Sequence, residues 1–277
     1  MDDRMHSIFG TKHLIIVGIC IVLMVGLFIF SKKFSFANVC KTMFYVGIVS
    51  ETIKIFYYII QNESVHGGVL PKTDLPFHLC SIQIIFIAVV NFSKNEKLKR
   101  FLLSFMFPSC LIGGIAAILI ATNSSLNGMW IITGQYFLYH VAIVVLALNI
   151  CTRKELKLTV SDYFNCLKFL VVLMFFAVYV NSIVDDGSGK INFMYVVSPP
   201  QSGLPFLNEK HGWLVYIVHY ACLIVFSVTM CYIKPIIVAI KARFALKNVV
   251  VEENLGTGEA ENLAAEEVAA TSNDTIE

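Results

Sequence analysis

Seven long apolar runs follow one another along this chain of 277 residues. Most of them come close to the ~20 residues that an α-helix needs to cross the ~30 Å hydrocarbon core of a membrane. Hydrophobic residues make up 57% of the chain and charged residues only 14%, a balance that soluble domains do not reach. The sequence therefore predicts an all-α polytopic membrane protein, a bundle of seven transmembrane helices over Leu14–Phe30, Val39–Ile60, Pro76–Phe92, Leu98–Ala121, Trp130–Ile150, Asn165–Val184 and Gly212–Ile233.

Basic residues are distributed unequally between the two sides of this predicted bundle. Thirteen Lys and Arg fall in alternate loops and after the last run, against five on the opposite side. Because cytoplasmic loops are enriched in Lys and Arg, the N-terminus is expected outside and the C-terminus in the cytoplasm. The predicted parts of this multi-pass cell-membrane protein are an extracellular N-terminus over 1–13, a membrane domain over 14–247 and a cytoplasmic tail over 248–277.

The predicted tail differs in composition from the rest of the chain. It contains eight acidic residues and no Lys or Arg. A segment that combines one sign of charge with few large apolar residues cannot bury a core. We therefore expect the tail to be solvated and disordered.

Four of the predicted helices carry a polar or ionisable residue in the half of the membrane nearest the outside. These residues are Glu51, Cys80, His140 and His219, and Gln83 follows Cys80 by one helical turn on a neighbouring face. An ionisable group in hydrocarbon is unfavourable by at least a few kcal/mol, so such residues face the interior of a bundle and one another. The pattern predicts a polar cavity that opens outward.

The residue types leave the role of this cavity open. Glu51 and Lys54 are three residues apart and could form an intrahelical ion pair that neutralises the span. His219 could be a hydrogen-bonded packing residue between helices. Cys80 and His140 form the minimal pair of nucleophile and base, but spacing between separate helices does not establish that they touch.

Motif searches remove several classes of enzyme. The chain has no GxSxG elbow, no HExxH pair and no phosphate-binding GxxxxGK loop. A zinc site would require histidines or cysteines at metal-binding spacing, whereas His211 and His219 are eight residues apart. No metal, other cofactor or nucleic-acid partner is predicted.

Several segments between residues 75 and 220 resemble motifs of the YwaF-like bacterial integral membrane proteins, and they occur in the same order. The segment LPFHLCSIQIIF is similar to the LPLHLCSI signature of that family. The other similar segments are GGIAAILIATN at Gly113–Asn123, FLYHVAIVVLAL at Phe137–Leu148, INFMYVVSPP at Ile191–Pro200 and HGWLVYIV at His211–Val218. This family is grouped with the transmembrane protein 164 family of membrane acyltransferases.

The resemblance implies acyl transfer or ester hydrolysis on a phospholipid or lysophospholipid in the membrane. Cys80 would be the nucleophile and His140 the base that takes its proton. Asn192, Gln83 or a backbone N–H would donate a hydrogen bond to the oxyanion. We expect little help from the helix dipole, because Cys80 would lie beyond the first turn of its helix.

A second class of function fits the same polar residues. In a non-catalytic seven-helix transporter, or in a protein that binds a lipid or small solute, Glu51, Lys54, His140 and His219 would form a proton relay or contact the ligand. Many transporters have duplicated halves and paired broken helices, and the sequence shows neither feature. The oligomeric state is not predicted.

The predicted orientation is tested by proteolysis of sealed cells. Protease added from outside should leave an epitope tag at the C-terminus uncleaved, because the excess of basic residues places the tail in the cytoplasm. Permeabilised cells provide the control in which the tag is removed. Cleavage of the tag in sealed cells would contradict the orientation.

Overall fold

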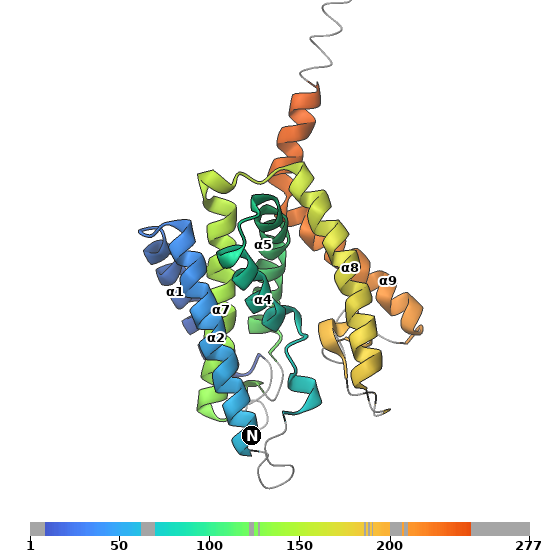
Figure 1. Cartoon of the computed structure of the whole chain (residues 1–277). Coiled ribbons are helices and arrows are strands. Elements are labelled where there is room, and N and C mark those ends of the chain that lie inside the picture. The colour runs from blue at the N-terminus through green and yellow to red at the C-terminus, as the bar shows by residue number, and fades with distance from the viewer. Residues whose placement is uncertain are drawn as a thin grey trace, which may run out of the picture. The chain divides into compact units, whose positions relative to one another are not determined.

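A computed structural model shows a chain of helices joined by loops (Figure 1). Contacts divide it into two compact units, Met1–Cys231 and Tyr232–Glu277, and residues 233–244 of the second unit are helical. The predicted tail over 248–277 lies outside the described residues. The structure describes residues 9–61, 70–121, 125–126, 128–185, 187, 189, 191–199, 207 and 210–244.

The described part of the first unit contains α-helices and short 3-10 helices, and no strand. The α-helices are α1 (Thr11–Ser31), α2 (Phe36–Gln61), α4 (Leu79–Phe92), α5 (Glu96–Leu119), α7 (Trp130–Thr152), α8 (Val160–Val184) and α9 (Trp213–Cys231). The 3-10 helices are η1 (Lys72–Asp74), η2 (Lys154–Leu156) and η3 (Phe193–Tyr195).

Six of the predicted spans are confirmed as helices long and apolar enough to cross a membrane. The remaining one, α4, has 14 residues and a length of about 21 Å, less than the hydrocarbon thickness of about 30 Å. It begins at Leu79 and not at Pro76, because His78 has an extended backbone with ψ of 150°. The seven-span count and the orientation stay predictions.

The helices α5 and α7 are the most buried of the six and pack against each other. The helix α5 also contacts α4, α8 and α9, while α7 also contacts α1 and α2. At one end of α5, Arg100 pairs with the buried Asp162 of α8 at 2.6 Å. Towards the other end, the Ile118 carbonyl is 2.8 Å from the ring of His13 in α1. These contacts make α5 the helix against which its neighbours are aligned.

Gly114 permits the closest approach between α5 and α7. A Cβ atom at this position would lie 2.5 Å from Cγ2 of Val144 and 3.2 Å from the backbone oxygen of His140. Real side chains do not tolerate the first distance, so only glycine lets α7 come this near. Its neighbour Gly113 has more room, since an added Cβ would meet Leu79 at 3.6 Å.

Replacing these two glycines one at a time should separate close packing from helix propensity. Gly114→Ala is expected to destabilise the protein by about 1–3 kcal/mol, because the extra methyl pushes α5 and α7 apart. Gly113→Ala should be neutral or stabilising by up to about 1 kcal/mol, since alanine is the better helix former. Thermal unfolding in detergent measures both. Equal stability of the two variants would show that the close approach is unimportant.

Candidate active site

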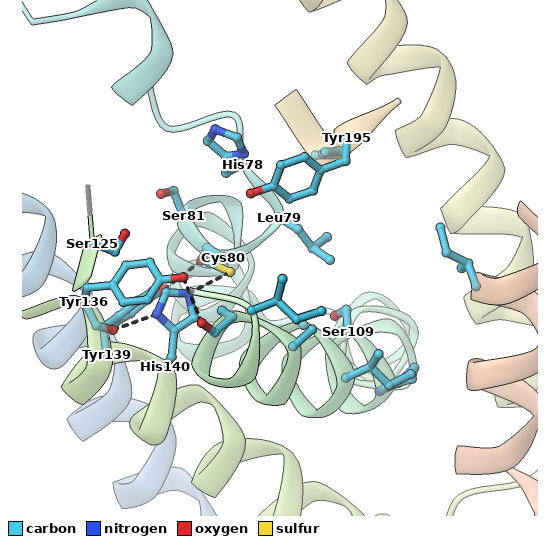
Figure 2. A pocket seen from close by; sticks show the side chains of 18 of the residues that line it. His78, Leu79, Cys80, Ser81, Ser109, Ser125, Tyr136, Tyr139, His140 and Tyr195 are labelled. Atoms are coloured by element: carbon cyan, nitrogen blue, oxygen red, sulfur yellow. Dashed lines mark hydrogen bonds between the residues drawn. The ribbon is translucent and has the colours of Figure 1, made fainter. Parts of the chain in front are cut away.

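The structure brings Cys80 and His140 into direct contact. The sulfur of Cys80, at the start of α4, lies 3.2 Å from Nε2 of His140 in the middle of α7 (Figure 2). The predicted proximity of these two residues is therefore confirmed. The distance fits a hydrogen bond between the thiol and the imidazole, which is the geometry that proton transfer requires.

A second hydrogen bond fixes the proton on the other ring nitrogen of His140. Nδ1 lies 2.7 Å from the backbone oxygen of Tyr136, one turn earlier on α7. A carbonyl can only accept, so Nδ1 carries the hydrogen in the neutral ring and Nε2 presents its lone pair to the sulfur. The ring of Tyr136 also packs on the imidazole, with centroids 4.3 Å apart. His140 is thus held as a proton acceptor towards Cys80.

The backbone around Cys80 is also held by α7. The hydroxyl of Tyr139 donates to the carbonyl oxygen of Cys80 at 2.8 Å. Because α4 begins at Leu79, Cys80 is the second residue of this helix and lies in its first turn. The expectation that Cys80 lies beyond the first turn is wrong. The positive end of the helix dipole therefore acts on the sulfur and favours negative charge there.

The first turn of α4 offers hydrogen-bond donors next to the sulfur. No side chain caps this end of the helix. The first N–H groups of a helix have no intrahelical partner, and here they belong to Leu79, Cys80 and Ser81. Among the described residues these donors remain available to an anion that forms beside Cys80.

Cys80 and His140 line a cavity of about 730 Å³. Its charged side chains come from α2 and η1, whereas α5, α8 and α9 contribute mostly apolar ones. The polar and charged residues lie mainly on α2, η1, the start of α4 and α7, and include Glu51, Lys54, Tyr58, Thr73, Asp74, His78, Ser81 and Gln135. The apolar ones lie mainly on α5, α8 and α9, and include Phe105, Ile112, Leu170, Leu223, Ile224 and Val228. The cavity is therefore amphipathic, with the Cys80–His140 pair in its wall.

Two of the other predicted residues lie at or beside the cavity. Glu51 lines it and forms an ion pair with Lys54 at 2.7 Å. Gln83 is buried and donates from Nε2 to the hydroxyl of Ser109 at 2.9 Å, and Ser109 lines the cavity. The Oε1 atom of Gln83 has no hydrogen-bond partner among the described residues. Gln83 thus supports the wall from behind.

The structure does not bring Asn192 and His219 to the cavity. Asn192 donates from Nδ2 to the Ser198 backbone oxygen at 2.8 Å and accepts from the Val197 N–H, so it stabilises its own loop. His219 is exposed on α9. The sequence predicted the depth of His219 along its helix but not the face of the helix on which it lies. In the structure, that face points away from the interior of the bundle.

Residues of η3, which sequence analysis did not single out, also line the cavity. Met194 and Tyr195 have positive φ values of 56° and 53°, an uncommon conformation for residues other than glycine. Side chains of α8 and α9 hold this turn by donating to consecutive carbonyls. The carbonyls of Phe193, Met194, Tyr195 and Val196 accept from Asn181, Tyr220, Tyr216 and Trp213 respectively. Figure 2 shows Tyr195 beside His78, and their ring centroids are 5.9 Å apart.

The tyrosines of α7 could have been found from the sequence. Tyr136 lies four residues before His140 in the stretch YFLYH, a spacing that places both on one helix face.

The described residues contain no group of three or more His, Cys, Asp or Glu that could hold a metal ion. The site offers a thiol, an imidazole and backbone N–H donors.

A comparison with protein families matches most of the chain. The model of the TMEM164 family matches residues 8–232, which include every helix from α1 to α9. No curated protein matches the chain. No solved structure matches it either.

The contact between thiol and imidazole should control the reactivity of Cys80. His140→Ala is expected to slow alkylation of Cys80 by iodoacetamide about tenfold or more, because the base that removes the thiol proton is lost. The exposed His219 provides the matched control, and His219→Ala should change the rate by less than about twofold. Peptide mass spectrometry measures the rate at Cys80 alone. An unchanged or faster rate in His140→Ala would contradict the assignment of His140 as base.

Proposed function

This chain belongs to the TMEM164 family, and we propose that it is a membrane-embedded acyltransferase or hydrolase that uses Cys80 and His140 on the ester of a phospholipid or lysophospholipid. The contact of 3.2 Å between sulfur and Nε2, in the wall of an amphipathic cavity, carries this proposal. Apolar helices support an integral membrane protein, and we place it in the cell membrane.

The first half of the proposed reaction forms a thioester. Nε2 of His140 takes the proton of Cys80 while the sulfur attacks the ester carbonyl carbon. The electron pair of the carbonyl moves onto oxygen and then returns as the C–O bond to the glycerol oxygen breaks. The leaving lyso-lipid oxygen takes the proton from Nε2. The acyl chain is then bound to sulfur, and the imidazole is neutral again.

The second half releases the acyl chain to an acceptor. A hydroxyl of a lyso-lipid, or a water molecule, gives its proton to Nε2 and attacks the thioester carbonyl. The C–S bond breaks, and the thiolate regains its proton from the imidazole. A lyso-lipid acceptor makes the protein an acyltransferase, and water makes it a hydrolase. Both outcomes use the same two residues.

Backbone N–H groups are the best candidates for stabilising the oxyanion. The side-chain amides of Gln83 and Asn192, also considered for this role, donate to Ser109 and Ser198 instead. The first turn of α4 places the N–H groups of Cys80 and Ser81 beside the reacting sulfur. Removal of one oxyanion donor from an enzyme typically lowers kcat by about 100-fold to 1,000-fold.

The alternative is a protein that only binds or transports a lipid or small solute. It would use the same cavity, with His140 contacting the ligand or relaying protons, and Cys80 would form no covalent bond to an acyl chain. Transfer of an acyl chain through Cys80 is the property that separates the two functions.

Substitution of the two residues tests the proposed reaction. In detergent with a phospholipid that carries a labelled acyl chain, Cys80→Ala should abolish acyl transfer, because no nucleophile remains. Cys80→Ser should keep a weak activity, since the less acidic hydroxyl depends wholly on His140 for removal of its proton. His140→Ala should strongly reduce acyl transfer when residue 80 is cysteine. It should abolish acyl transfer in the Cys80→Ser variant.

Cys110 gives the matched control for the nucleophile. It is a buried cysteine of α5 outside the lining of the cavity, so Cys110→Ala should retain activity. Equal transfer of label by wild type and Cys80→Ala would refute the nucleophile and leave the binding or transport function in its place.

A further inference from the structure

Three charged side chains gather in the lining of the cavity, and the proposed acyl chemistry does not use them. Lys54 and Glu51 lie on α2, and their Nζ and Oε1 atoms are 2.7 Å apart. Both are largely buried, with side chains 15% and 19% exposed. Asp74 of η1 lines the same cavity. Ionic groups within a membrane bundle are unfavourable and commonly mark a binding or transport site, so this cluster requires an explanation.

Asp74 connects the ion pair of α2 to the loop before α4. Its carboxylate accepts from the Thr73 hydroxyl at 3.1 Å and hydrogen-bonds the hydroxyl of Tyr58. Burial raises the pKa of the Asp74 carboxyl, while these hydrogen bonds and the nearby Lys54 charge act in the opposite direction. A cation bound beside Asp74 would therefore favour its charged form.

The cluster lies close to the start of the helix that carries Cys80. Lys54 interacts electrostatically with His78, the residue immediately before α4. Lys54, His78 and Cys80 all belong to the lining of one cavity. A ligand whose reactive ester reaches Cys80 thus brings neighbouring atoms within reach of Lys54. An ion pair that only neutralised the α2 span would not need to line the cavity that contains Cys80.

We propose that Glu51, Lys54 and Asp74 form the subsite for the headgroup of a zwitterionic phospholipid. Lys54 would contact the phosphate, and the carboxyl groups would contact the ammonium. This inference rests on the proposed function, since it assumes that the cavity takes a phospholipid. The apolar side chains of α5, α8 and α9 would then surround the acyl chains.

The balance of charge favours a zwitterion over an anionic lipid. The cluster holds two carboxyl groups and one amine, so a headgroup with a phosphate alone would add negative charge to a site that already has it. In a medium of low dielectric, an unbalanced charge is strongly unfavourable. A headgroup that carries both a phosphate and an ammonium supplies one partner for Lys54 and one for the carboxyl groups.

Lipid binding to the unreactive Cys80→Ala protein tests the subsite without any chemistry. Native mass spectrometry in detergent gives the Kd for three ligands with identical acyl chains: phosphatidylcholine, phosphatidylglycerol and diacylglycerol, which has no headgroup. Lys54→Met should weaken phosphatidylcholine binding about tenfold or more and diacylglycerol binding by less than about threefold, because charge-assisted contacts to phosphate are lost. Asp74→Asn should narrow the preference for phosphatidylcholine over phosphatidylglycerol.

Two further variants separate headgroup binding from folding. Lys54→Met leaves Glu51 unpaired, so Glu51→Gln with Lys54→Met removes both charges and keeps the site neutral. This double variant should also lose the advantage of phosphatidylcholine over diacylglycerol. Lys41→Met removes an exposed amine from the same helix and should bind all three ligands like its parent.

Each outcome of these titrations decides the inference. Equal weakening of phosphatidylcholine and diacylglycerol, or no weakening, overturns it. A preference of the Cys80→Ala parent for phosphatidylglycerol over phosphatidylcholine also overturns it. Because binding is measured without a thioester, the subsite and the reaction can fail separately. Headgroup discrimination by the Cys80→Ala protein, together with no acyl adduct on Cys80 of the wild-type protein, would refute the proposed reaction and retain the subsite.

Discussion

The contact between the Cys80 sulfur and the His140 ring depends on three helices that meet closely at one level of the bundle. Gly114 lets α7 approach α5 until a Cβ would touch the backbone at His140. The hydroxyl of Tyr139 in α7 donates a hydrogen bond to the backbone carbonyl of Cys80 and so fixes the start of α4. Tyr136 orients the imidazole. The thiol therefore faces a proton acceptor that is already in the correct tautomer, so little reorganisation is needed before proton transfer.

The surroundings of this pair explain why a lipid is the substrate we propose. Polar and charged side chains at one part of the cavity come from α2 and the residues before α4, and apolar side chains come from α5, α8 and α9. An amphipathic molecule can satisfy both parts at once, whereas a small polar solute would leave the apolar wall without a partner. The first turn of α4, with its free N–H groups, lies where the ester of such a molecule would react.

Depth along a helix could be predicted from the sequence, but rotation about its axis could not. The rise per residue and the motifs around Cys80 and His140 place both in the outer half of the membrane, and they do meet. His219 also has a suitable depth, yet it lies on the exposed face of α9, while Tyr216 and Tyr220 face the η3 turn. The positive φ values of Met194 and Tyr195 had no signal in the sequence, because no glycine marks that turn. The late start of α4 likewise depends on the extended backbone of His78.

The most direct test of a Cys80 nucleophile is to find the acyl group on the sulfur. Purified protein is incubated with a phospholipid that carries an isotopically labelled acyl chain, and its peptides are mapped by mass spectrometry before and after neutral hydroxylamine, which cleaves thioesters. We predict the labelled acyl mass on the peptide that contains Cys80, with loss of that mass after hydroxylamine. Label on another residue, or turnover of the lipid with no adduct on Cys80 under any quench condition, would contradict the mechanism.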